Sequence, residues 1–226
     1  MTLIKIDRID SFRQYDPEWY QIRKGKMTGS LWPSVYSLRD GKFKAGASRW
    51  IYRIAAEIMT DQSEEEEYEN YKMEWGKEVE PEARDWYAEK FKVEVKEFAF
   101  VQSSEFPLMG FSPDFYTKKG EVFRSVQVKS PYYTSIFLDA VLGGKYSPDM
   151  KTQCVFELAL DQRLAGIDLF FFDPRIPNED KQGHIVETFN RKELKEEIAA
   201  MRTAMTNFHK DVEGVFKEFE FKSEGK

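Results

Sequence analysis

The chain has 226 residues, 41% hydrophobic and 33% charged, with a formal net charge of -6, which describes an ordinary globular protein long enough to bury one core. It contains no apolar stretch near the roughly 20 residues of a membrane span and no signal-peptide core, so we expect one domain over residues 1–226, in the cytoplasm. Its only cysteine, Cys154, excludes an internal disulfide and a cysteine-based zinc cluster.

The N-terminal part of the chain shows helical periodicity. The spacing of its apolar residues predicts four helices, at residues 17–24, 30–38, 48–58 and 71–91. Gly25 ends the first helix, and the hydroxyl groups of Ser30 and Ser48 can cap the second and the third. Pro81 lies inside the fourth, where its missing backbone N–H would allow a break or a kink.

After residue 91 the apolar period changes to that of strands. The pattern predicts strands at residues 93–101, 108–111, 115–118, 121–129, 167–172 and 185–189. Two further helices are predicted at residues 150–162 and 191–216. This order predicts an α/β (α+β) fold, with a central mixed β-sheet flanked by helices, rather than a doubly wound nucleotide fold.

Several common catalytic motifs are absent from the sequence. It has no glycine-rich phosphate loop of the Walker or dinucleotide type, and no G-x-S-x-G motif of a serine nucleophile. Its two histidines, His184 and His209, lie far apart and belong to no H-E-x-x-H motif. These absences argue against a nucleotide-binding fold, a serine hydrolase and a zinc hydrolase.

The middle of the chain contains a lysine and several side chains with oxygen atoms that could form one site. Asp114 follows Ser-Pro in a predicted turn, and Gln127 and Lys129 lie on the strand that begins a few residues later. Because residues i and i+2 of a strand point to the same face, we expect Gln127 and Lys129 to face Asp114 together. Glu80 lies upstream, on the fourth predicted helix.

Such a set of residues suits phosphodiester hydrolysis. Carboxylate and carbonyl oxygens hold Mg²⁺, a hard cation that polarises the phosphate and lowers the pKa of a bound water. A lysine beside that water can orient it and offset negative charge in the transition state. Taken alone the pattern is weak, because an exposed strand with alternating polar residues gives the same letters.

Six short blocks of sequence surround these residues. They are residues 19–25 with 27–30, residues 75–77 with Glu80 and 83–84, residues 112–114, residues 128–131, Gln153, and residues 172–175. In this order and spacing the chain resembles the bacteriophage lambda exonuclease family, the YqaJ-like viral recombinases of the PD-(D/E)xK nuclease superfamily. The first block resembles the family's W-x-x-x-R-x-G…T-x-S pattern, and the fourth its E-L-K-C-P pattern. The resemblance implies a restriction-endonuclease-like core.

The resemblance also implies a metal site with Mg²⁺ as cofactor, for which Mn²⁺ can substitute, and with two ions expected. Asp114 would be a direct ligand that bridges both ions, and Glu80 would serve the second ion or its water shell. The backbone carbonyl of Val128 would be a further ligand. Lys129 would contact the attacking water.

Six residues are implied in binding DNA. Arg23 and Ser30 match family positions that hold the phosphate at a recessed 5′ end, Ser112 can donate to phosphate, and Met73 matches an apolar wedge that splays the duplex end. Gln153 and the Arg39 loop with Lys42 and Lys44 are further candidates. Bland alternatives remain open: Arg23 as a surface residue, Ser30 as a helix cap only, Met73 as core, and Val155 in place of Gln153 in the alignment.

Gln127 departs from the family pattern, which has an acidic residue at this position. A neutral amide oxygen stabilises a bound hard divalent cation less than a charged carboxylate does. We weigh three accounts: a natural variant in which Asp114 and Glu80 still hold the metal, an engineered substitution that traps substrate, and a degenerate DNA-binding relative. We favour the first, because the other site residues are intact. Glu121 is too far along the strand to substitute.

The function implied is digestion of one strand of linear double-stranded DNA, processively from 5′ to 3′, to mononucleotides. The expected setting is phage or prophage recombination in a bacterial cytoplasm, by a homotrimeric ring working with a single-strand annealing protein. Residues 1–60 carry 11 Lys and Arg against 6 Asp and Glu, and residues 61–90 carry 4 against 12, which suits a protein that meets phosphate with one surface.

Two alternatives to this function stay open. The first is a PD-(D/E)xK endonuclease with the same metal site and no ring. The second is a catalytically weakened protein that binds DNA ends, because of Gln127. We interpret Asp173 and Arg175, in the last block, as residues that fix a turn.

Overall fold

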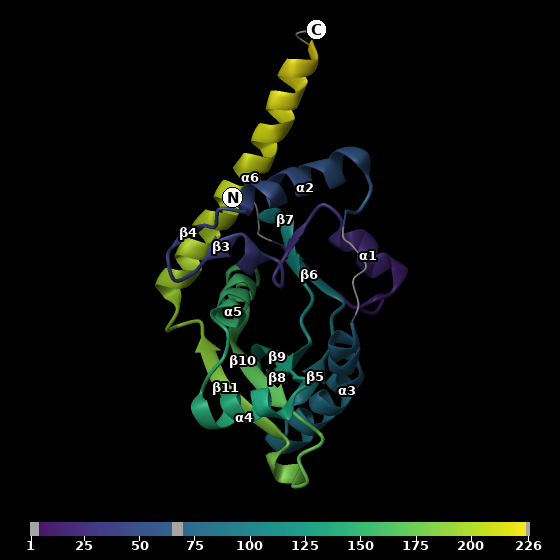
Figure 1. The fold of residues 1–226 in the computed structure, drawn as a ribbon, viewed down its shortest axis with the longest axis vertical. Helices are drawn as coiled ribbons and strands as arrows, with labels where there is room; N and C mark the ends of the chain where they lie inside the picture. Colours follow the sequence, from purple (N-terminus) through teal and green to yellow (C-terminus); the bar gives the residue numbers. More distant parts are fainter. Residues whose placement is uncertain (1–4, 65–69, 225–226) are drawn as a thin grey trace.

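The computed structural model describes residues 5–64 and 70–224, so part of the acidic segment 61–90 lies outside the described residues. Figure 1 shows how the helices and strands are arranged. The helices are α1 Pro17–Arg23, α2 Ala47–Thr60, α3 Tyr71–Phe91, α4 Thr134–Gly143, α5 Pro148–Leu160 and α6 Lys195–Glu224, with short 3-10 helices η1 Trp32–Ser34 and η2 Glu179–Lys181. The strands are β1 Ile6–Ile9, β2 Met27–Thr28, β3 Tyr36–Ser37, β4 Lys42–Phe43, β5 Glu94–Lys96, β6 Phe100–Ser103, β7 Phe106–Phe111, β8 Phe115–Lys119, β9 Val122–Lys129, β10 Leu164–Phe172 and β11 Gly183–Asn190.

A five-stranded mixed sheet forms the centre of the fold. Its strand order is β11-β10-β9-β8-β5, and only β9 and β10 run parallel to each other. Their parallel connection runs through α4 and α5, as a crossover between parallel strands requires. The predicted central mixed sheet flanked by helices is confirmed.

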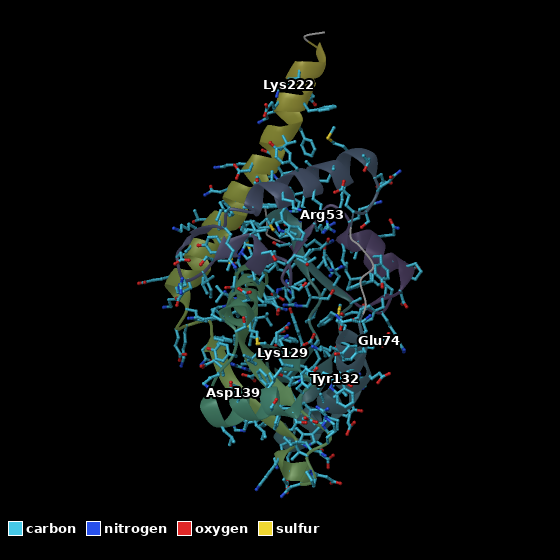
Figure 2. The ribbon with its side chains drawn as sticks, viewed as in Figure 1. Arg53, Glu74, Lys129, Tyr132, Asp139 and Lys222 are labelled. Atoms are coloured by element: carbon cyan, nitrogen blue, oxygen red, sulfur yellow. The ribbon has the colours of Figure 1, made fainter. Side chains whose placement is uncertain are left out.

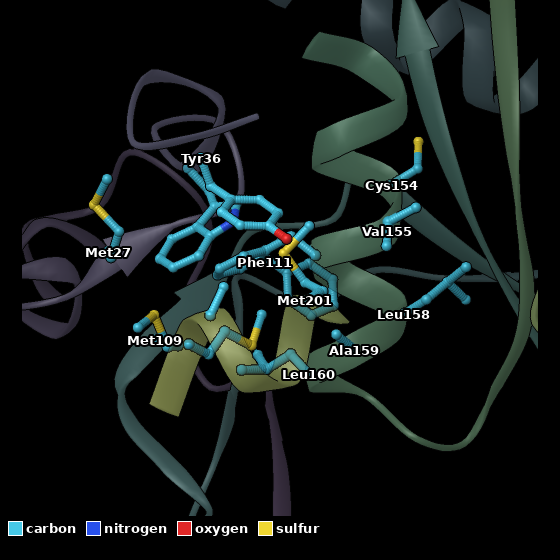
Figure 3. Close-up of a cluster of buried hydrophobic side chains, with 14 of the residues drawn as sticks. Met27, Tyr36, Met109, Phe111, Cys154, Val155, Leu158, Ala159, Leu160 and Met201 are labelled. Atoms are coloured by element: carbon cyan, nitrogen blue, oxygen red, sulfur yellow. The ribbon is translucent and has the colours of Figure 1, made fainter. Parts of the chain in front are cut away.

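Helices cover the two faces of this sheet with separate groups of apolar side chains. On one face α3 buries Val79, Ala83 and Tyr87 against Phe170 and Phe172 of β10. The alternate side chains of β10 join the larger core, which includes residues of α5 and α6. Figure 3 shows part of this core, with residues of α5 beside Met201 of α6 and Phe111 of β7.

A second sheet positions the turn that carries Asp114. Its strand order is β1-β6-β7-β2, and β7 leads directly into Ser112-Pro113-Asp114. Gly110 lets β6 approach closely, because a Cβ atom there would lie 2.1 Å from the ring of Phe100. A two-stranded sheet, β3-β4, stands apart from both.

The helix predicted at residues 30–38 is wrong. The chain forms the short 3-10 helix η1 and then the strand β3, and Ser30 caps no helix, since the residue before η1 is Leu31. Both Trp32 and Val35 are fully buried, so the core rather than local helix propensity sets the path of this segment. The cap predicted at Ser48 is also wrong, because α2 begins one residue earlier, after Gly46.

Other boundaries differ because the chain changes sheets. The strand predicted at residues 93–101 divides into β5, in the central sheet, and β6, in the second sheet. The sequence pattern also missed β1 and α4. Pro81 does not break α3, since buried residues on both sides of it hold the helix against the sheet. None of the described helices is both long enough and apolar enough to cross a membrane.

Candidate active site

Asp114, Gln127 and Lys129 come together where β9 ends. The carboxylate of Asp114 accepts a hydrogen bond from the backbone N–H of Val128 at 2.6 Å, which ties the Ser112-Pro113-Asp114 turn to β9. The Lys129 ammonium donates to Gln127 Oε1 at 3.3 Å, so the two side chains share a face of the strand as predicted. Figure 2 shows Lys129 in the middle of the molecule, where these elements meet.

Glu80 reaches the same place from α3. It lines a cavity of about 640 Å³ together with Tyr15, Lys77 and Asp114. A smaller hollow of about 240 Å³ is lined by the same four residues and by Met73, Gly76, Val128 and Ser130. Both carboxylates therefore border open space that another molecule can enter.

The carboxyl groups of the site stand in a strongly negative environment. Burial raises the pKa of Glu80 to about 8, and the negative charge of Asp114 adds to this effect. Burial also raises the pKa of Asp114, while Lys129 and the N–H of Val128 oppose the rise. The phenol of Tyr15 has its pKa raised to about 12 by burial, Glu80 and Asp114. This charge pattern favours a cation at the site.

The donor atoms fit a hard divalent cation. The carboxylates of Glu80 and Asp114 line the smaller hollow with Val128, and Gln127 precedes Val128 on β9. Oxygen donors of this kind suit Mg²⁺. Within residues 5–64 and 70–224, no group of three His, Cys, Asp or Glu side chains is close enough to hold a metal ion. The fit therefore depends on Gln127 and on a backbone carbonyl in addition to Asp114 and Glu80.

A buried polar network backs Gln127 from α5. Gln127, with 1% of its surface exposed, donates from its amide nitrogen to the carboxylate of Glu157 at 2.8 Å. Gln153 donates to Gln127 Oε1 at 2.9 Å and to Glu157 at 3.4 Å. Glu157 is fully buried, and its pKa is raised to about 8 by burial and by Asp114.

Trp19 connects the proposed phosphate-binding residues to the carboxylate site. Its indole N–H lies 2.7 Å from Ser112 Oγ and donates to it, and the guanidinium of Arg23 lies 4.2 Å from the centre of its ring. The ring of Tyr15 lies 5.0 Å from that of Trp19, and Tyr15 also lines the cavity with Glu80 and Asp114. Arg23 itself is buried, with 8% of its surface exposed.

Ser30 follows Gly29, which packs against Gln153 of α5. Ser30 is exposed, and its hydroxyl lies 3.3 Å from that of Thr28. The neighbouring Gly29 packs against Phe111, Phe156 and Gln153, so a Cβ atom at Gly29 would lie 3.7 Å from the Gln153 side chain. The structure thus brings Ser30 to the side of the site that α5 forms.

Met73 and Arg39 differ in their relation to the site. Met73 is 46% exposed at the edge of the smaller hollow, which excludes the core alternative for this residue. Arg39 lines a separate cavity with Lys44, Lys145 and Lys151, and its guanidinium pairs with Asp40. The structure does not bring Arg39 to the carboxylates.

Asp173 and Arg175 hold the segment that follows Lys129. Arg175 pairs with the buried Asp173 at 2.7 Å and donates to the backbone carbonyls of Pro131 and Tyr132. Its guanidinium also lies 4.5 Å from the ring centre of Trp75 on α3. These contacts agree with a structural role in fixing the chain beside the site.

Three residues of the site were not singled out from the sequence. Lys77 lies three residues before Glu80 on α3, a spacing that places both on one helix face and could have indicated it. Tyr15 has a φ of 73°, a backbone conformation rare for a residue of its type, which no sequence pattern signals. Glu157 lies four residues after Gln153 on the same face of α5, in the second half of the helix, whose other residues are apolar.

The chain is similar to known families and structures. The model of the YqaJ-like viral recombinase domain matches residues 18–160. The crystal structure of LHK-Exo, an alkaline exonuclease from Laribacter hongkongensis, has a TM-score of 0.74 and 23% identity, over 93% of this chain and 99% of that one. The same values hold for LHK-Exo in complex with dAMP. A phage related exonuclease from Haemophilus somnus 129PT has a TM-score of 0.56 and 12% identity, over 86% and 96%. No curated protein matches the chain.

The fold is that of the PD-(D/E)xK nucleases, and Asp114 and Lys129 lie where β9 of its central sheet ends, with Glu80 beside them on α3. The family match runs from α1 to the end of α5, which is more than half of the chain. The chain therefore belongs to the family of YqaJ-like viral recombinase domains, and the resemblance noted in the sequence is confirmed.

Proposed function

We propose that the protein is a Mg²⁺-dependent exodeoxyribonuclease that degrades one strand of linear double-stranded DNA from 5′ to 3′, releasing mononucleotides. The observation that carries this proposal is that Glu80 and Asp114 line one cavity at the end of β9, within the electrostatic influence of Lys129, which donates to Gln127 on the same strand. Family membership and the similarity to LHK-Exo, whose structure in complex with dAMP is known, support it.

Each site residue has a distinct part in this reaction. Asp114, Glu80, Gln127 Oε1 and the carbonyl of Val128 would hold the cation. Mg²⁺, with Mn²⁺ as a substitute and two ions expected, would supply the positive charge that polarises the phosphate. Lys129 would orient the attacking water and offset the charge that develops on the phosphate oxygens.

The surrounding residues would bind the end of the DNA. Arg23, Ser30, Ser112 and Gln153 would contact the phosphates, with Arg23 held in place by the ring of Trp19. Met73, exposed at the edge of the smaller hollow, would push against the terminal base pair. The loop with Arg39, Lys42 and Lys44 would follow the duplex backbone, where Lys and Arg contribute most of the affinity for phosphate.

The proposal extends to partners and setting. We infer a homotrimeric ring around DNA, a single-strand annealing protein as partner, and a role in phage-type recombination in a bacterial cytoplasm. A ring would let basic residues line a channel while acidic residues cover the outside, which reconciles DNA binding with a net charge of -6.

The function is tested by incubating 5′-phosphorylated linear duplex with Mg²⁺ and measuring mononucleotides released. The wild type should digest one strand, and Lys129→Ala should lower the rate by about 10²- to 10³-fold, as the loss of one transition-state contact does. Lys119→Ala, an exposed lysine of β8, is the matched control and should keep full activity.

Two results would contradict the assignment of the site or the proposed nuclease activity. Full activity of Lys129→Ala would reject the assignment of the site. End binding without nucleotide release, in Mg²⁺ and in Mn²⁺, would favour a catalytically weakened DNA-end-binding protein, the second candidate, which the neutral Gln127 favours.

A further inference from the structure

Glu157 is a buried acid beside the site, and no sequence motif indicated a role for it. It lies on α5 with 0% of its surface exposed, and its nearest hydrogen-bond donors are the amides of Gln127 and Gln153 and, at 3.4 Å, the hydroxyl of Ser125. Lys129 lowers the pKa of Glu157 at longer range, and no Lys or Arg within the described residues forms a salt bridge with it. A buried carboxylate held only by neutral donors is costly, so its presence calls for a compensating role.

The contacts around Gln127 fix which end of its amide faces the site. Its nitrogen, which only donates, meets the carboxylate of Glu157 at 2.8 Å. Its oxygen, which only accepts, meets two donors, the ammonium of Lys129 at 3.3 Å and the amide of Gln153 at 2.9 Å. A flipped amide would place donor against donor, so Glu157 directs Gln127 Oε1 toward Lys129, whose charge acts on Glu80 and Asp114.

The same contacts show what a carboxylate at position 127 would meet. Both of its oxygens would accept, and one would lie against the carboxylate of Glu157 where the amide nitrogen now donates. Two buried carboxylates at this distance repel each other strongly. Exchanging the two side chains instead would keep one acid and one amide. The short bond between positions 127 and 157 would reverse direction, and the longer contact of Gln153 with position 157, at 3.4 Å, would be lost.

We propose that Glu157 is a positioning residue for the metal site, and that Gln127 and Glu157 together do what a carboxylate at position 127 would do alone. Glu157 orients Gln127 Oε1 toward the cation, and in its ionised form, which a bound cation favours, it would provide from α5 the negative charge that Gln127 lacks. This inference rests on the metal-dependent nuclease function proposed above. It accounts for Gln127 as part of a matched pair and not as a lost ligand.

The test is a double-mutant cycle that follows Mn²⁺ binding to the protein without DNA, by titration calorimetry, and melting temperature in EDTA. Glu157→Gln should weaken Mn²⁺ binding by about 10- to 100-fold, as loss of a partner behind a metal ligand does. Gln127→Glu should lower the melting temperature, because it faces Glu157. The double variant Gln127→Glu/Glu157→Gln should regain both properties, with Mn²⁺ affinity within about twofold of wild type.

Asp168→Asn is the matched control, since Asp168 is a buried carboxylate of β10 that pairs with Arg124 and lies outside the site. It should lower the melting temperature and leave Mn²⁺ affinity unchanged. Wild-type affinity in Glu157→Gln would overturn the inference, as would a double variant no better than the weaker single variant. Tighter Mn²⁺ binding and higher nuclease activity in Gln127→Glu would overturn it too, because they would show a site that lacks a carboxylate.

The outcomes also separate this inference from the proposed function. A wild type that digests DNA and binds Mn²⁺, but shows no coupling in the cycle, would overturn the inference alone. A wild type that neither binds Mn²⁺ nor releases nucleotides would overturn both. If Gln127→Glu does not fold, rescue of folding by Glu157→Gln supports the pairing, and absence of rescue contradicts it.

Discussion

Glu80 and Glu157 are carboxyl groups that the fold keeps from ionising easily. Both have a pKa raised to about 8 from the ordinary value of 4.5, because burial removes water and Asp114 adds a negative charge nearby. A cation would favour the ionised form of each. The site is therefore prepared for more positive charge than Lys129 supplies.

A dependence of stability on pH follows from these two groups. Because the folded pKa lies above the unfolded one, their contribution is complete below pH 4.5 and is lost as the pH rises through about 8. The melting temperature in EDTA should therefore fall between about pH 5 and 9, and Mg²⁺ should raise it most at the alkaline end. Glu80→Gln should flatten the curve in EDTA. A melting temperature that rises over this interval would contradict the assignment.

Met73 offers a test of how the DNA end is opened. Because the residue is exposed, Met73→Ala should fold as the wild type does. It should slow digestion of blunt duplex ends and leave ends that are already unpaired almost unaffected, since only the former need their last base pair opened. If Met73→Ala slows nucleotide release equally from blunt and from unpaired ends, Met73 does not act as a wedge.

Among the site residues, the sequence predicted the relative orientation of those that lie on one strand. Gln127 and Lys129 face the same way because strand geometry alone requires it. Glu80 was noted upstream on the predicted helix, but no sequence pattern showed that it lies near Asp114, because only the packing of α3 on the sheet brings it there. Tyr15 and Glu157 could not be predicted, because a left-handed backbone at one and the placement of α5 for the other depend on tertiary contacts.

Among the elements, the segment after β9 depends on one arginine. Arg175 joins the buried Asp173 to the carbonyls of Pro131 and Tyr132, directly after Lys129. Arg175→Ala would leave Asp173 without its charged partner, and should reduce the free energy of unfolding by about 1–3 kcal/mol. Nuclease activity should fall as well, because the end of β9 loses its support.

Urea denaturation measures this effect, with Arg163→Ala as the control. Arg163 is an exposed arginine before β10, and its loss should change the free energy of unfolding by less than about 0.5 kcal/mol. Equal stability of Arg175→Ala and wild type would show that the contacts of Arg175 with Asp173 and with the segment after β9 do not stabilise the fold.

Elements with long, regular apolar patterns were predicted well, and short ones were not. The bounds of α3 match the prediction, and β9 and β10 differ from it by one and three residues at their starts. In α4 only Phe137 and Ala140 are buried, while Ile136, Leu138 and Leu142 are exposed, so its pattern resembles no amphipathic helix. The break between β5 and β6 reflects a change of sheet, which periodicity does not encode.

For the whole molecule, topology of the DNA separates an exonuclease from an endonuclease. The proposed ring enzyme needs an end, so covalently closed circular duplex should stay intact under conditions that digest the same DNA after it is made linear. Cutting of the closed circle, seen as linear product on a gel, would favour the endonuclease alternative.

The oligomeric state is a separate expectation at this scale. Sedimentation should give the mass of three chains if the ring forms. Binding to duplex ends should weaken steeply with salt, because Lys and Arg side chains release counterions from the DNA when they bind phosphates. A monomer that digests DNA processively would contradict the proposed trimeric ring and would leave the proposed exonuclease reaction standing.

The position of Trp19 gives the molecule an optical property. Its indole N–H donates a hydrogen bond to Ser112, and the guanidinium of Arg23 lies over its ring. The ring of Tyr15 lies 5.0 Å away. Its emission should therefore change when phosphate draws on Arg23 or when a cation alters the field felt by Tyr15. A variant that keeps Trp19 as its only tryptophan would report the arrival of DNA and of metal as two separate fluorescence phases, with no dye attached.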